Sequence, residues 1–291
     1  MIDLKITDVR AHPGDSAFLI DDGKTAILYD TGFAFTGYAV ADKIKAALGK
    51  RSLDYIFLTH SHYDHALGSV YALKYWPEAK VVAGEYAFKI FAKDSAKQLM
   101  RSLDRKFAEK CGVSEYEDLI DDLKADIAVQ DGDTIKAGDM TFRAIALPGH
   151  TKCSVAFYLI ENKLLLSCET LGVYDGKETI FPSYLVGYRM ALDSIAKAKA
   201  LDIENILLPH LGLLSKEQTK FYLDNIESAS INYANAVADI LRNGGTKADV
   251  TEHFRKNFYH EDIKLSYPPD AMELNTGIIA EVIRRELVDI Q

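Results

Sequence analysis

The feature that most constrains this chain is residues 59–65 (THSHYDH), which follow a short apolar run. Three histidines and one aspartate fall within six residues there. The flanking patterns predict a buried strand over 54–59 and a helix over 64–75. Side chains in extended chain repeat every two residues, so His60 and His62 point the same way. Imidazole and carboxylate suit zinc, iron and other first-row metals. The segment therefore predicts a metal site, and its spacing suits two ions better than one.

Further candidate ligands follow other predicted strands. His150 lies in a glycine-bearing turn, Glu169 follows an apolar run, and His210 comes directly after the predicted strand 205–208. Loops at the ends of strands supply chemistry on a rigid scaffold in layered α/β proteins. We therefore expect these three side chains to complete the ligand set that begins at His60.

Composition excludes several classes of protein. The chain has 291 residues, 48% of them hydrophobic, and a net charge of −9, which disfavours a protein that binds nucleic acid through a broad basic face. No apolar stretch is long enough to span a membrane, and the first ten residues lack the pattern of a signal peptide. Three cysteines without paired spacing fit a reducing compartment. We expect a cytoplasmic protein that binds neither nucleic acid nor membranes.

The motif and the order of the later ligands resemble the metallo-β-lactamase superfamily, whose signature is H-x-H-x-D-H followed by a distant His, an Asp and a final His. The resemblance covers roughly residues 1–214. It implies an α/β fold, an αββα sandwich with two mixed sheets face to face and metals at the sheet edge. The sequence Asp30-Thr31-Gly32 resembles the early D-T-G turn of the family, whose Asp holds the metal loop by hydrogen bonds without binding metal.

The resemblance also implies a role for each ligand. Three residues would bind the first ion, three the second and one would bridge them: His60, His62 and His150; Asp64, His65 and His210; and Glu169. Two divalent ions are expected, with zinc first and iron or manganese as alternatives.

Glu169 departs from the family pattern, which has Asp at the bridging position. The alignment of residues 166–170 (LSCET) favours Glu169, because a carboxylate can bind two metals and this register retains Thr170. Cys168 offers another interpretation, since zinc β-lactamases use a Cys ligand near this point.

Two helical additions are predicted around the core. Residues 84–125 are charged and helical in pattern, with a candidate helix start at Ser114, and we interpret them as an insertion. We expect their removal to alter substrate range while leaving metal bound. Residues 215–291 are predicted to be a helical C-terminal extension packed on the domain 1–214, and Ser215–Gln218 has the sequence of a capping box.

The expected activity is hydrolysis of a small ester, thioester or related substrate by a metal-activated hydroxide. Two ions lower the pKa of a shared water from ~15.7 toward ~7, and Asp64 accepts that water's hydrogen bond. Among family members, the helical additions resemble glyoxalase II and quinolone-signal-response thioesterases in placement. The alternatives left open are a phosphodiesterase, a di-iron oxidoreductase and a metal-containing ligand sensor without turnover.

Candidate substrate contacts are fewer and rest on position alone. Tyr63 lies inside the motif, while Tyr184, Tyr188 and Arg189 follow Glu169 in a segment expected to border the metals. Arg189 could bind a substrate carboxylate or phosphate, or pair on the surface instead. The expected partner is a small-molecule substrate, and a homodimer through the helical elements is left open.

Overall fold

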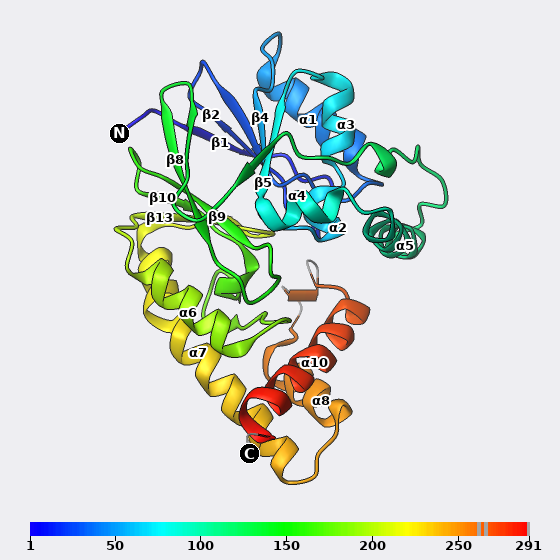
Figure 1. The fold of residues 1–291 in the computed structure, drawn as a ribbon, viewed down its shortest axis with the longest axis vertical. Helices are drawn as coiled ribbons and strands as arrows, with labels where there is room; N and C mark the ends of the chain where they lie inside the picture. The colour runs from blue at the N-terminus through cyan, green and yellow to red at the C-terminus, as the bar shows by residue number, and fades with distance from the viewer. Residues whose placement is uncertain (261–262, 265–266, 290–291) are drawn as a thin grey trace. The chain divides into compact units, whose positions relative to one another are not determined.

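The computed structural model describes residues 1–260, 263–264 and 267–289 of the chain. Within these residues the strands form two six-stranded sheets and one two-stranded sheet (Figure 1). The first sheet has the order β1 (Lys5–Asp8), β2 (Phe18–Asp21), β3 (Ala26–Tyr29), β4 (Tyr55–Leu58), β5 (Lys80–Gly84) and β6 (Ile127–Val129). The second has the order β14 (Gly212–Leu213), β13 (Asn205–Leu208), β10 (Leu164–Leu166), β9 (Val155–Leu159), β8 (Met140–Ala146) and β7 (Thr134–Ala137).

Contacts divide the chain into two compact units, which we describe separately. The first comprises residues 1–146 and 155–166. Its β1, β2 and β3 are antiparallel, whereas β3 to β6 run parallel. The two sheets meet through aromatic rings: Phe57 of β4 lies 4.6 Å from Phe157 of β9 and 5.0 Å from Phe142 of β8, between ring centroids. These buried rings form the centre of the sandwich.

The helices of the first unit either cover its first sheet or belong to the insertion. They are α1 (Gly37–Leu48), α2 (Tyr63–Ala66), α3 (Ser69–Tyr75), α4 (Glu85–Phe91), α5 (Asp94–Lys110) and the 3-10 turn η1 (Ile120–Asp122). The helix expected over 64–75 is interrupted at Leu67 and Gly68. A Cβ on Gly68 would lie 1.9 Å from the carbonyl oxygen of Thr31, so only glycine permits this close approach.

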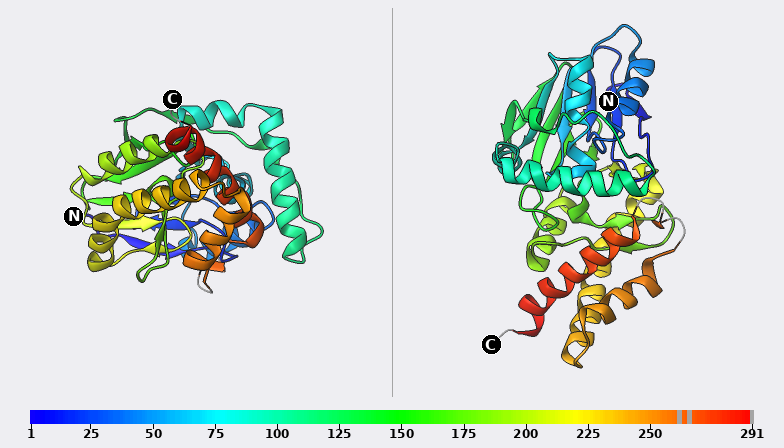
Figure 2. Two further views of the ribbon diagram at one scale, coloured as in Figure 1. Left: turned by 90° about the horizontal axis from the view of Figure 1, so that it is seen from below. Right: turned by 90° about the vertical axis from the view of Figure 1, so that its right-hand side faces the viewer.

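The second unit comprises residues 147–154 and 167–291. It contains the paired strands β11 (Val173–Tyr174) and β12 (Ile180–Phe181), together with β13 and β14. Its helical elements are η2 (Glu169–Leu171), α6 (Tyr188–Lys199), α7 (Lys216–Arg242), α8 (Lys247–Phe258), α10 (Pro269–Ile283) and the π-helical turn η3 (Arg284–Val288). Helices α8 and α10 pack on one another (Figure 2), and their apolar side chains share one buried cluster with α6 and α7.

The predicted α/β fold, with two sheets, a helical insertion and a helical C-terminal extension, is confirmed. The helix start at Ser114 is wrong, because residues 113–119 are not helical. This segment is instead tied to α5: Asp118 accepts hydrogen bonds from Arg101 and Arg105. The domain boundary after residue 214 stays a prediction. None of the described helices is both long and apolar enough to cross a membrane.

Candidate metal centre

The first half of the ligand set lies where β4 passes into α2. His60 follows the strand, His62 precedes the helix, and Asp64 and His65 lie in its first turn. The ring of His60 lies 4.6 Å from that of His62 and 4.1 Å from that of His65, between centroids. His60 and His65 are fully buried, whereas His62 and Asp64 are partly exposed. Four potential ligands therefore gather at one strand end.

Asp30 orients His65 from the end of β3. Its Oδ2 lies 2.8 Å from His65 Nδ1, and Thr59 donates to Oδ1 through its backbone N–H at 2.9 Å. Asp30 holds a positive φ of 49°, a conformation that is rare outside glycine. Because Asp30 accepts the hydrogen on Nδ1, the other ring nitrogen of His65 is left with a lone pair.

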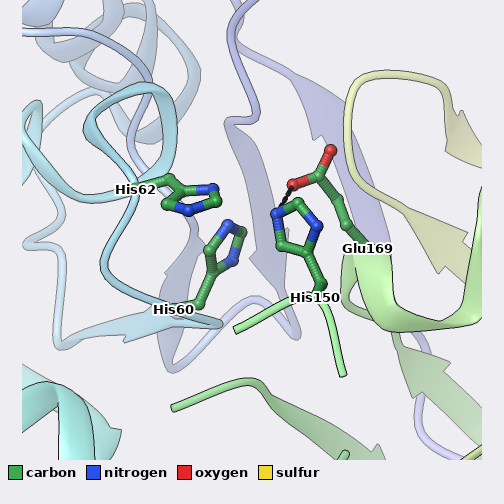
Figure 3. Close-up of side chains that lie close together, drawn as sticks. All are labelled: His60, His62, His150 and Glu169. Atoms are coloured by element: carbon green, nitrogen blue, oxygen red, sulfur yellow. Dashed lines mark ion pairs between the residues drawn. The ribbon is translucent and has the colours of Figure 1, made fainter. Parts of the chain in front are cut away.

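The second half of the ligand set consists of His150, Glu169 and His210. His150 Nε2 lies 2.7 Å from Glu169 Oε2, the ion pair drawn in Figure 3. His210 Nε2 lies 3.6 Å from the other carboxylate oxygen, Oε1. His210 has a φ of 61°, so a second residue of the candidate site holds a left-handed backbone. Such strain persists where surrounding contacts fix it, and it clusters at functional sites.

Ser183 orients His150 and was not found by sequence reasoning. Its carbonyl oxygen lies 2.7 Å from His150 Nδ1, and its hydroxyl lies 2.9 Å from the same atom. Thr170 accepts the backbone N–H of His150 at 3.1 Å. This contact uses the backbone carbonyl of Ser183, a group that every residue has. The sequence therefore carries no signal for it, and only the folded chain identifies Ser183.

The donor set fits a divalent transition metal. His60, His65 and His150 each have Nδ1 next to a hydroxyl, a carboxylate or a carbonyl oxygen. Metal-binding histidines use such a partner to fix the tautomer that leaves Nε2 for the metal. Imidazole donors favour zinc, copper, iron or nickel over magnesium and calcium, which prefer oxygen ligands.

Among the described residues, the predicted ligands fall into two groups that could each hold a metal ion. Within each group, every residue offers one ligand atom, and these atoms all lie within 4.8 Å of one another. The groups are His60, His62, His150 and Glu169 (Figure 3), and Asp64, His65 and His210. At bond lengths of ~2.0–2.2 Å, two ligands of one ion are separated by at most about 4.4 Å, so both groups approach the spacing that an ion requires. Cys168, the alternative to Glu169, is fully buried and belongs to neither group.

The four candidate substrate contacts do not share one environment. Tyr63 is partly exposed and lies 5.6 Å from Phe33 between ring centroids. Tyr184 and Tyr188 are buried in the apolar cluster of the C-terminal helices, 1% and 6% exposed. Arg189 is in the first turn of α6, and its guanidinium donates to the carbonyl oxygen of Glu286 at 3.3 Å. The alternative that Arg189 pairs on the surface is therefore observed, and a role of Tyr184 and Tyr188 at the metals stays a prediction.

Comparison with known sequences identifies the family of this chain, and comparison with solved structures shows a similar fold. The family described as the metallo-beta-lactamase superfamily matches residues 14–210. A hydroxyacylglutathione hydrolase of Brucella anthropi is 28% identical over 133 residues, which are 45% of this chain and 39% of that protein. A nitric oxide reductase of Moorella thermoacetica is 25% identical over 217 residues, 74% of this chain and 46% of that protein. The chain thus spans less than half the length of these curated relatives.

A solved structure extends the similarity in fold to nearly the whole chain. The metallo-beta-lactamase family protein of Thermus thermophilus has a TM-score of 0.64 and 16% identity, covering 98% of this chain and 93% of that one. At this identity the likeness concerns the fold alone. It includes the region of the C-terminal helices, which lies beyond the residues that the family match covers.

Proposed function

Because the chain belongs to the metallo-beta-lactamase superfamily, we propose that it is a dinuclear metal-dependent hydrolase. The observation that carries this proposal is the pair of ligand groups built from five histidines and two carboxylates. Hydroxyacylglutathione hydrolases among the relatives support hydrolysis as the reaction.

In this proposal each of the seven residues has one role. The first ion would be held by His60, His62 and His150, the second by Asp64, His65 and His210, and Glu169 would be shared between them. The two oxygens of Glu169 support the bridge, because one faces His150 and the other faces His210. Zinc is the first candidate, with iron and manganese as alternatives.

The chemistry divides between the ions and the protein. When bound, two divalent ions would supply Lewis acidity and lower the pKa of water at the site. Asp64 would use one carboxylate oxygen as a ligand and accept the hydrogen bond of the attacking water with the other. Asp30 keeps the proton of His65 on Nδ1, and Ser183 does the same for His150. These contacts fix the ligands before substrate binds.

We propose a small ester or thioester as the substrate. The support is the activity named for the hydroxyacylglutathione hydrolases and the presence of helical additions around the core. Tyr63 remains the candidate substrate contact, because it is partly exposed beside Asp64. Three cysteines without paired spacing support a reducing compartment, and we propose the cytoplasm. A homodimer through the helices stays an open proposal.

A di-iron oxidoreductase is the second candidate, and the match to a nitric oxide reductase favours it. The flavo-diiron oxidoreductases, which resemble this family, carry Glu in place of the second motif histidine, the position of His62 here. This chain has His62, which adds a nitrogen donor and supports the hydrolase first.

One experiment separates these candidates. The protein is purified from cells grown without added metal, its metals are measured by mass spectrometry, and it is assayed on four probes. The probes are a hydroxyacylglutathione, an acyl-coenzyme A, 4-nitrophenyl acetate and bis(4-nitrophenyl) phosphate. We expect two zinc or manganese ions per chain and turnover of an ester or thioester, lost on chelation and restored by metal. Turnover of the phosphodiester alone would support a phosphodiesterase instead.

Two other results would contradict the hydrolase. Two irons with reduction of nitric oxide or oxygen, and no hydrolysis, would favour the oxidoreductase. Bound metal without turnover of any probe would favour a ligand-sensing protein.

A further inference from the structure

A buried acid on the insertion takes no part in the proposed chemistry. Asp104 lies on α5, the long teal helix of Figure 2, and its side chain is fully buried. One carboxylate oxygen accepts the backbone N–H of Ala34 at 2.9 Å, and the other accepts the hydroxyl of Tyr116 at 2.5 Å. A carboxylate is costly to bury unless it is hydrogen-bonded, so these two contacts account for its retention inside the protein.

The Ala34 contact connects α5 to the turn that holds the candidate ligands. In this turn, residues 30–36, Thr31 donates through its backbone N–H and its hydroxyl to the carbonyl oxygen of His65, both at 2.7 Å. Gly32 accepts the backbone N–H of Gly68 at 3.1 Å, just beyond α2. The turn and the helix that carries Asp64 and His65 therefore form one hydrogen-bonded assembly.

The same turn has a second buried anchor, Asp15. One of its oxygens accepts the backbone N–H of Phe33 at 3.1 Å and the hydroxyl of Thr36 at 2.7 Å. Gly32 has a φ of 73°, and a Cβ there would lie 2.4 Å from Asp15 Oδ1. Asp15 is close in sequence to the turn, whereas Asp104 reaches it from the insertion.

Aromatic packing accompanies the Asp104 contact. Phe107, one helical turn after Asp104, lies 4.9 Å from Phe33 between ring centroids. Phe33 in turn lies 5.6 Å from Tyr63, which begins α2. Helix α5 thus contacts the turn 30–36 through Asp104, and it is connected to Tyr63 through the rings of Phe107 and Phe33.

We propose that Asp104 is a positioning residue for the second metal ion. By accepting the Ala34 N–H it fixes the turn 30–36, and through Thr31 it fixes the orientation of His65 and Asp64. This inference rests on the dinuclear centre proposed above. It replaces the expectation that the insertion can be removed without affecting the metals.

The test is zinc affinity in three variants of the full chain. Protein stripped with a chelator is titrated with Zn²⁺ in the presence of a competing chromophoric chelator, so that both binding steps are resolved. Asp104→Ala removes the acceptor, and we expect about 10- to 100-fold weaker binding of one of the two ions, the range for residues that orient ligands. Asp104→Asn keeps an oxygen for the Ala34 N–H, and we expect affinity within about threefold of the wild type.

Asp118→Asn is the matched control on the same insertion. Its carboxylate pairs with Arg101 and Arg105 of α5, so its loss should lower stability without changing either zinc affinity. Equal zinc binding by Asp104→Ala and wild type would overturn the inference, as would equal weakening in Asp104→Ala and Asp118→Asn.

Two further outcomes keep the test decisive. If Asp104→Ala does not fold, Tyr116→Phe carries the test, because it removes the hydrogen bond that holds the other oxygen of Asp104. We expect a severalfold weakening of one ion there, and unchanged affinity would overturn the inference. A wild-type protein that binds fewer than two zinc ions would contradict the proposed function itself, which separates that failure from the failure of Asp104.

Discussion

At the scale of single residues, the candidate bridge is Glu169, where the resemblance to the family implies Asp. Glu169 has one oxygen near His150 and the other near His210, whereas the neighbouring Cys168 is fully buried. A carboxylate that bridges two cations must carry its negative charge. Its neutral amide analogue keeps the shape of the side chain and loses that charge.

We therefore expect Glu169→Gln to lower kcat/KM on the best ester or thioester probe by about 100-fold or more. Cys168→Ser, the matched change one residue away, should stay within a few-fold of the wild type. Steady-state kinetics on both variants, with metal content measured in parallel, provides the test. A larger loss in Cys168→Ser than in Glu169→Gln would show that the bridging ligand is misassigned.

Asp104 also gives a prediction for the pH dependence of stability. Burial raises the pKa of Asp104 from 3.8 to about 6, although the hydroxyl of Tyr116 and the N–H of Ala34 oppose the shift. The folded protein then binds the proton more tightly than the unfolded chain. This group's contribution to the free energy of unfolding therefore falls as pH rises from about 4 to about 6.

Asp104→Asn removes this titration. We expect its unfolding free energy, relative to the wild type, to increase between pH 4 and pH 7 by up to about 3 kcal/mol. Chemical denaturation of both proteins across that range measures this difference in unfolding free energy. The contributions of the other titrating groups are the same in both proteins and cancel. Asp118→Asn should change in the opposite direction and mainly below pH 4, because burial of Asp118 is outweighed by its bond to Arg101, which lowers its pKa from 3.8. A flat difference for Asp104→Asn would contradict a raised pKa.

Side-chain chemistry limited which site residues the sequence could reveal. His60, His62 and His65 stand close together in one motif, so their type and spacing were sufficient to predict a ligand set. Ser183 contacts His150 through its backbone carbonyl oxygen, and Thr31 donates its backbone N–H to the carbonyl oxygen of His65. Such contacts depend on which loops meet in the fold, and no local pattern encodes them.

At the scale of elements, locally determined features were predictable. The capping boxes at Ser215–Gln218 and Thr246–Asp249 are present, because both partners of each lie within one turn of helix. The same motif at Ser114 starts no helix, since side chains of that segment are bound by α5. Strands of two residues, such as β11 and β14, are too short to show a periodic pattern.

The cap of α7 can be tested alone. Ser215 accepts the backbone N–H of Gln218 at 3.2 Å, and Gln218 accepts that of Ser215 at 3.0 Å. Ser215→Ala should lower the free energy of unfolding by about 1 kcal/mol. Ser228→Ala, an exposed change on the same helix, should stay within about 0.5 kcal/mol of the wild type. Equal effects of the two changes in chemical denaturation would contradict the capping role.

At the scale of the whole molecule, the order of the motifs along the chain carried the fold prediction. The family match spans residues 14–210, and the ligands predicted from the sequence all fall within it. The residues after 210 lie beyond this match, so only their local features, helical periodicity and capping boxes, were predictable. Their packing into one apolar cluster depends on tertiary contacts between distant helices.

The central claim is that seven side chains hold two metal ions, and metal stoichiometry tests it most directly. Mass spectrometry of protein prepared with excess zinc and then desalted should give two ions per chain for the wild type. His62→Ala and His150→Ala, which each remove a ligand of the first ion, should give one. A wild type without bound metal, or variants that keep both ions, would contradict the account.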